Sequence, residues 1–191
     1  MKKSLIAAGA ASVALAAMPI VGAFAASNAD VTDTINLTVG SGCTITSGAS
    51  NRNAVAISTT PGGAAQTADG DAIVLNCNTA SWTMTAIGGT SATPNTTLTG
   101  AGAAIATGTA TSGSTSNWAF KIKDLDTTSA SNADIETGYN KYVAVPGTAT
   151  TVVTGKATGA VSIQPSYQVY TAGGQATGAY SGTVTYTIAA S

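Results

Sequence analysis

Residues 178–191 read GAYSGTVTYTIAAS, and their alternation decides the fold class. The large apolar side chains of this segment share one parity: Tyr180, Val184, Tyr186 and Ile188. The hydroxyl side chains share the other: Ser181, Thr183, Thr185 and Thr187. A side-chain period of two is that of a β-strand, so the segment predicts a strand with one buried face and one polar face. We therefore expect the apolar set to be buried and the threonines to face water or a polar neighbour.

The same alternation recurs along the chain between turn-forming residues. Further apolar runs of strand length occupy residues 31–45, 54–58, 72–77, 82–86, 118–123, 139–145, 150–154 and 159–171. Within the last of these, Pro165 is expected to mark a break or a sheet edge. No convincing helical period occurs after residue 26, and short strands separated by Gly, Pro and Asn favour antiparallel pairing. The sequence predicts an all-β fold, an immunoglobulin-like antiparallel β-sandwich of about seven to nine strands.

The first 25 residues have the three parts of a secretory signal peptide. A basic head with Lys2 and Lys3 precedes an apolar stretch at 5–17, and Ala23-Phe24-Ala25 is a small-x-small cleavage signal. The alternative is a membrane anchor, but the apolar stretch is short for a hydrocarbon layer of about 30 Å. We expect a signal peptide at 1–25, one domain at 26–191, no membrane span after cleavage, and a location outside a bacterial cell or on its surface.

Charge is scarce in this chain. Charged residues make up 8% of the sequence, about a third of the usual ~25%. So few Lys and Arg side chains cannot neutralise a nucleic-acid backbone, and they offer no basic patch to an anionic membrane. Partners of both kinds are therefore excluded, and the wet surface is expected to be rich in Thr, Ser, Asn and Gly.

Cys43 and Cys77 are the two cysteines of the chain. In an exported protein such a pair predicts one disulfide bond, and closing a loop of this length is worth roughly 3–4 kcal/mol in the chain-entropy model. The alternative, a metal site, lacks further cysteines, and the sequence contains no histidine.

The sequence offers no recognisable catalytic set. Without histidine, His-based triads and His metal sites are excluded, and no credible base accompanies any serine. The acidic residues that cluster are Asp124, Asp126, Asp134 and Glu136. They could hold a calcium ion or supply a glycosidase pair, but their spacing matches no calcium loop, and a solvated loop is the simplest interpretation. We predict no enzyme activity, no cofactor and no metal.

The aromatic residues leave a second possibility open. Trp82 and Trp118 lie in alternating strands, where each is either a core residue or a platform for a sugar. An exposed tyrosine among Tyr139, Tyr142 and Tyr170 could also stack on carbohydrate.

Three features together resemble a known group of proteins. The first cysteine follows an alternating strand, the second ends the run AIVLNC, and the chain finishes in GAYSGTVTYTI. This arrangement resembles bacterial fimbrial subunits and spore-coat-U-like secreted proteins, which are variant immunoglobulin-like sandwiches with a disulfide joining early strands. Fimbrial subunits usually have an aromatic residue next to last, where this chain has Ala190. The ending is also similar to that of WxL-type cell-surface proteins, although the Trp-x-Leu motif is absent.

The segment at 26–40 has two interpretations. Its apolar residues alternate like those of a strand that fills a groove: Val31, Ile35, Leu37 and Val39. The segment is either the first strand of its own sandwich or, as the fimbrial resemblance implies, a strand that completes a neighbouring subunit. We expect a secreted, non-catalytic structural or adhesive surface subunit that acts through strand edges and Thr-rich faces, with itself or another surface subunit as partner. The alternative is a secreted carbohydrate-binding module.

Overall fold

The computed structural model describes residues 42–47, 54–109, 112–125 and 132–190, all of which belong to one compact unit, Gly40–Ser191. The predicted signal peptide, the boundary at Ala26 and the segment at 26–40 lie outside these residues. The described chain contains strands and turns but no helix, which confirms the all-β prediction. Accordingly, the search of this part of the chain for a helix able to cross a membrane finds none.

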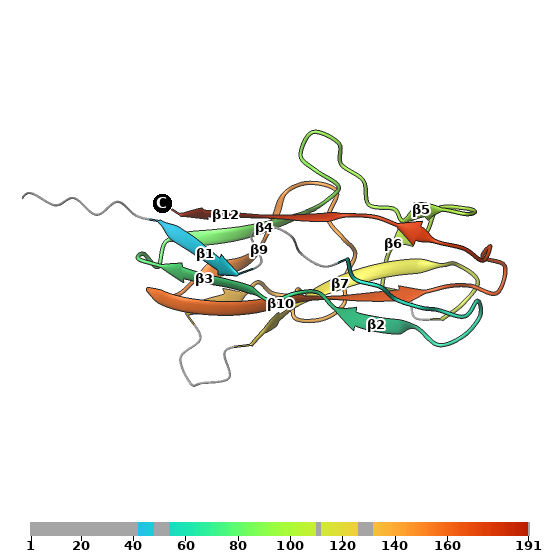
Figure 1. Cartoon of the computed structure of the whole chain (residues 1–191), viewed down its shortest axis with the longest axis horizontal. Helices are drawn as coiled ribbons and strands as arrows, with labels where there is room; N and C mark the ends of the chain where they lie inside the picture. The colour runs from blue at the N-terminus through green and yellow to red at the C-terminus, as the bar shows by residue number, and fades with distance from the viewer. Residues whose placement is uncertain (1–41, 48–53, 110–111, 126–131, 191) are drawn as a thin grey trace, which may run out of the picture. The chain divides into compact units, whose positions relative to one another are not determined.

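The strands form two main sheets and one short ribbon (Figure 1). Sheet A has the order β1-β3-β10-β7-β6, with β2 also paired to β10: β1 Cys43–Ser47, β2 Gln66–Asp69, β3 Ile73–Cys77, β6 Ala106–Thr107, β7 Asn117–Asp124 and β10 Gly159–Tyr170. Sheet B has the order β12-β4-β9-β8: β4 Trp82–Gly88, β8 Ala133–Ile135, β9 Thr150–Gly155 and β12 Val184–Ala190. The ribbon pairs β5 Thr99–Gly100 with β11 Tyr180–Ser181.

The core lies between the inner faces of sheets A and B. Its largest fully buried side chains come from both sheets and their loops: Trp82, Phe120, Leu75, Met84, Ile105, Ile122, Ile163, Val145, Val152, Val153, Val161 and Pro165. Burying a side chain of this kind contributes about 1.5–3 kcal/mol, so the facing of the two sheets is the main source of stability. The sandwich-like arrangement of antiparallel sheets agrees with the predicted fold class.

The described residues form twelve strands rather than the expected seven to nine. The additional ones are mostly very short, since β5, β6 and β11 have two residues each. A two-residue strand has no alternation to detect, and β6 pairs with β7 in parallel, the one exception to antiparallel pairing among the described strands. The predicted final strand is also divided into β11 and β12 around Gly182, where a Cβ would lie 2.7 Å from Leu98 Cδ2.

Two predicted strands are loops in the structure. Residues 54–58 have no strand pairing, and residues 139–145 pair with β7 only at an isolated bridge between Val143 and Phe120. Tyr139 also accepts a 2.7 Å hydrogen bond from Ile122 N, so this loop covers the edge of β7 without becoming a strand of its own.

Pro165 was expected at a break or an edge; it does not break its strand, but the ladder on one side of that strand is interrupted beside it. It is buried in the middle of the longest strand, β10. On one side β10 pairs with β3 up to Ile163 and with β2 from Ser166 onwards, so Pro165 lies where one partner strand gives way to the next. Its carbonyl accepts a 2.8 Å bond from Gly70 N.

Cys43 and Cys77 form a disulfide bond, as predicted. They are directly opposed residues of the adjacent strands β1 and β3, with a Cα–Cα distance of 4.1 Å. The bond therefore joins an edge strand to the next strand of the same sheet.

Replacing both cysteines with alanine should lower the free energy of unfolding by about 3–4 kcal/mol, because the unfolded chain regains the freedom of the 34-residue loop. Urea unfolding of the two proteins measures this difference. A reducing agent should destabilise the natural chain and leave the double alanine variant unchanged. Equal stability of the natural chain, the reduced natural chain and the double alanine variant would show that the bond contributes nothing.

The faces of β12 are oriented as predicted, but its apolar face is covered less than expected. Val184, Tyr186 and Ile188 pack against the core and are half-buried. On the other face Thr187 is exposed, while the hydroxyl of half-buried Thr185 donates a 2.6 Å bond to the carbonyl of Gly89. The partial burial follows from position, because β12 pairs with β4 and with no other described strand.

Ile188→Asp should cost about 1.5–3 kcal/mol of stability from lost apolar burial, with a further cost for placing a carboxylate against the core. Thr187→Asp, on the exposed face of the same strand, should change stability by less than about 0.5 kcal/mol. Thermal or urea unfolding of the pair tests the face assignment. Similar losses in both variants would contradict it.

Candidate functional site

The outer edge of β12 is the most distinctive surface of the described chain. β12 has seven residues without a charged residue or a proline, and its pairing with β4 runs without a bulge. Gly89 N donates a 2.9 Å hydrogen bond to Thr183 O. The odd-numbered residues that follow Thr183 therefore direct their backbone groups toward β4. In an antiparallel pair the other parity directs its N–H and C=O groups away from the partner. Val184, Ile188 and Ala190 therefore present backbone groups along the outer edge.

The other sheet edges carry features that discourage pairing. Natural proteins protect edges with short strands, charges and bulges. β8 is three residues long and includes Asp134, which lies 2.8 Å from Lys156 Nζ. β1 is bulged between Ile45 and Ser47, and β6 has only two residues. β12 differs from each of them because it is long, regular and neutral.

Beside this edge the core is incompletely covered. The half-buried apolar residues that pack there come from β1, β10 and β12: Cys43, Tyr167, Val184, Tyr186, Ile188 and Ala190. The strands β1 and β12 contact each other, so the ends of sheets A and B meet on this side (Figure 1). The hydroxyls of Tyr167 and Tyr186 lie 3.2 Å apart and join the two sheets. An additional strand along β12 would cover this apolar strip.

The predicted partner-strand residues Val31, Ile35, Leu37 and Val39 lie outside the described part of the chain. That part begins at Gly42, immediately before β1. In the sequence, residues 40 and 41 separate Val39 from this part of the chain.

Both tryptophans are core residues. Trp82 is 2% and Trp118 is 4% exposed, so neither presents a flat face on which a sugar could stack. The Trp118 indole donates a 2.8 Å bond to Thr96 O, whereas the indole nitrogen of Trp82 has no partner among the described residues. This leaves the tyrosines as the aromatic side chains that could meet a carbohydrate.

The tyrosines are mostly committed to contacts within the fold. Tyr170 is buried, and its hydroxyl donates a 2.7 Å bond to Gly113 O. Tyr139 is half-buried with its ring 5.7 Å from that of Phe120. Tyr142 is also half-buried, and the ammonium of Lys121 lies 4.5 Å from its ring centre. No open aromatic platform results from these three positions.

The acidic residues do not gather into a site. Within the described residues no group of three or more possible metal ligands occurs, and Asp126 lies outside them. Asp134 is paired with Lys156, and the carboxylate of Glu136 accepts a hydrogen bond from the Thr154 hydroxyl. The calcium and glycosidase interpretations therefore gain no support from the arrangement of Asp124, Asp134 and Glu136.

The sequence did not indicate a polar cluster on the outer face of sheet A. Lys123 Nζ lies 2.6 Å from both carboxylate oxygens of Asp69, which comes from β2. Buried Ser166 lies beside them, with its hydroxyl 2.9 Å from that of Tyr142. Hydrogen bonds from Lys123 and then from Ser166 lower the pKa of Asp69 below its ordinary value of 3.8. The alternation of β7 predicted an outward Lys123, but its partner is 54 residues away in sequence.

Because folding lowers the pKa of Asp69, the Asp69–Lys123 pair should stabilise the fold above about pH 4 and lose this contribution as the pH falls through the folded-state pKa. Asp69→Asn should therefore flatten the acid limb of a stability–pH curve measured by urea unfolding. Lys123→Gln should weaken the same limb, since it removes the main cause of the lowered pKa. An unchanged acid limb in both variants would show that the pair does not contribute.

Comparison of the chain with protein-family models, with curated proteins and with solved structures finds no match. The resemblance to fimbrial subunits thus rests on the residues that suggested it and remains a prediction.

Proposed function

We propose that this protein is a secreted, non-catalytic structural or adhesive subunit of a bacterial surface that acts by adding a β-strand along β12. The observation that carries the proposal is the long, neutral, unbulged outer edge of β12 above a half-covered apolar strip. The predicted signal peptide and the Cys43–Cys77 disulfide support a location outside the cytoplasm, where such bonds persist.

Strand addition suits both parts of this surface. The outward N–H and C=O groups of β12 would bond a partner strand, which supplies affinity through the backbone. The strip that includes Val184 and Ile188 would receive alternate apolar side chains of the same strand, which supplies specificity. The alternation of Val31, Ile35, Leu37 and Val39 has the required period of two.

The segment at 26–40 is the proposed strand, and two sources remain open. In the self-completed form the segment pairs with β12 of its own chain and bends at Gly40-Ser41-Gly42 to enter β1 in the other sheet. This form is the simpler one, because it leaves no exposed edge on the monomer. In the donated form the same segment pairs with β12 of a neighbouring copy, and the chains form polymers.

Deleting residues 26–39 from the secreted chain tests the proposal, with a synthetic peptide of residues 26–40 supplied in trans. The truncated protein should be less stable, should bind the peptide, and should recover stability when it does. The matched control is the same peptide with Ile35→Asp and Leu37→Asp, which keeps the backbone donors but cannot fill the strip. Equal stability before and after deletion, or equal effects of the two peptides, would overturn the proposal.

Size-exclusion chromatography of the full chain at micromolar concentration then identifies the source of the strand. Self-completion predicts a monomer at all concentrations, whereas donation predicts a ladder of oligomers. Val184→Pro, which removes an outward N–H of β12, and Ile188→Asp should shorten such a ladder, and Thr67→Ala on the outer face of sheet A should leave it unchanged.

A further inference from the structure

The outer face of sheet B carries threonines on three adjacent strands, β12, β4 and β9. The register of the sheet places Thr187 of β12 opposite Thr85 of β4, and Thr85 opposite Thr151 of β9. Met84 and Ala86, which flank Thr85 in β4, are fully buried in the core. Because successive side chains of a strand point to opposite faces, this row of threonines lies on the outward face of the sheet.

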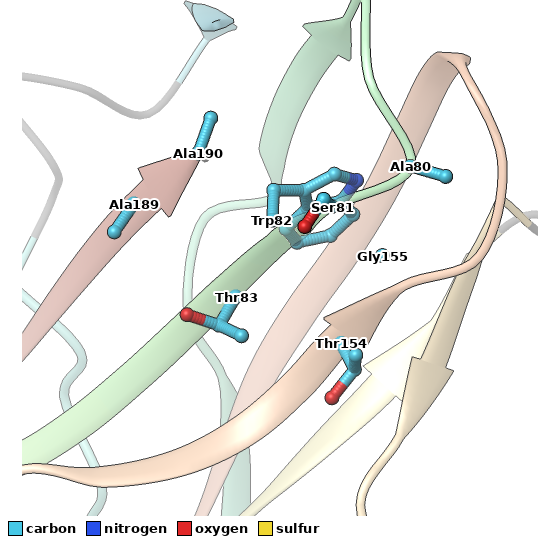
Figure 2. Close-up of a pocket in the computed structure, with 8 residues that line it drawn as sticks. All are labelled: Ala80, Ser81, Trp82, Thr83, Thr154, Gly155, Ala189 and Ala190. Atoms are coloured by element: carbon cyan, nitrogen blue, oxygen red, sulfur yellow. The ribbon is translucent and has the colours of Figure 1, made fainter. Parts of the chain in front are cut away.

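A second row lies beside the first. Ala189, Thr83 and Thr154 are opposed on the same three strands, which Figure 2 shows at close range. On β9 an additional residue separates the two rows, because its register with β4 shifts between them. The Thr154 hydroxyl donates to the Glu136 carboxylate. The other hydroxyls of the two rows have no hydrogen-bond partner among the described residues, and they form what we call the threonine array: Thr83, Thr85, Thr151 and Thr187.

The geometry of a sheet holds these side chains at defined spacings. Adjacent strands lie about 4.7–4.9 Å apart, and residues two apart on one strand are separated by about 6.8 Å. Threonine is β-branched, so its hydroxyl and its methyl group have few alternative positions. The array therefore repeats a polar and an apolar group in two directions. Such a surface can hold water in fixed places, through hydrogen bonds to the hydroxyls and through the ordering of water around the methyls.

The array is uncharged, which limits what it can bind. β12, β4 and β9 contain no charged residue. The acidic residue of this sheet lies on β8, beyond the array, where Asp134 is paired with Lys156 at 2.8 Å. A charged polymer therefore finds no free counter-charge on the three strands. Both tryptophans are buried, so a sugar finds no indole to stack on. The complement of this face is a neutral surface that repeats hydrogen-bonding groups at short intervals.

We propose that the threonine array on the outer face of sheet B binds the surface of ice. In ice, water oxygens form rows whose repeats in two directions are close to the two spacings of the array, so several hydroxyls can bond lattice waters at once. Neighbouring strands are rotated by about 20–25°, so only adjacent strands match one flat crystal plane and the binding is weak. This activity goes beyond strand addition, because it uses outward side chains rather than the backbone groups of the β12 edge.

The test follows the growth of ice crystals in a frozen solution of the full secreted chain, with serum albumin at the same concentration as the reference. The natural chain should keep the crystals small at micromolar concentration and should be enriched in slowly grown ice. Thr187→Lys inserts a long charged side chain at an exposed position of the array, so roughly tenfold more protein should be needed for the same effect. The matched control is Thr67→Lys, at an exposed position on the outer face of sheet A, which should act as the natural chain does.

Ala189→Lys, at the other exposed position of the two rows, is a second variant and should lose the effect in the same way. Urea unfolding of the three lysine variants separates a loss of binding from a loss of folding, and substitutions at exposed positions should change stability by less than about 0.5 kcal/mol. The proposal is wrong if crystals grow as fast with the natural chain as with albumin, or if folded Thr187→Lys and Ala189→Lys act as the natural chain does. Retention on microcrystalline cellulose or chitin without an effect on ice would also overturn it. The oligomer ladder and the peptide experiment test strand addition separately, so either proposal can fail alone.

Discussion

The strand β10 holds the described fold together, because it is the one strand that pairs with β2, β3 and β7. Its twelve residues place Val161, Ile163 and Pro165 in the core and give sheet A a continuous inner face. Sheet B can bury its own apolar face only against this surface. The stability of β12, at the far edge of sheet B, therefore depends on an inner face that β10 organises.

The sequence-based predictions were correct where the local pattern of side chains was compatible with the contacts that the whole fold requires. The alternation at 118–122 predicted β7, and the pairing of Cys43 with Cys77 followed from their number and their expected compartment. The predictions were wrong where the local structure depended on which strands pair with each other. Pro165 has the local signature of a break, yet it is tolerated because two partner strands meet beside it. Residues 139–145 alternate like a strand, yet they bond β7 at too few points to become one.

The candidate sites were less predictable for the same reason. The residues of β12 were visible in the sequence, but whether a strand lies at an edge depends on which strands pair, and alternation carries no such information. Trp82 and Trp118 have the same local pattern of apolar and polar neighbours. Only the loop that brings the Thr96 carbonyl to one of them makes their chemistry different. Such differences arise from contacts between segments far apart in sequence.

The scarcity of charge links the fold to the proposed function. A chain in which 8% of residues are charged has few with which to guard its edges, and the described short edges β8 and β2 contain Asp134 and Asp69. β12 contains none, so an uncovered β12 would be a template for uncontrolled pairing. Val184 and Ile188 are half-buried, so an uncovered β12 also leaves apolar surface in contact with water, which costs free energy. On both grounds the proposed strand along β12 would stabilise this domain, whichever chain supplies it.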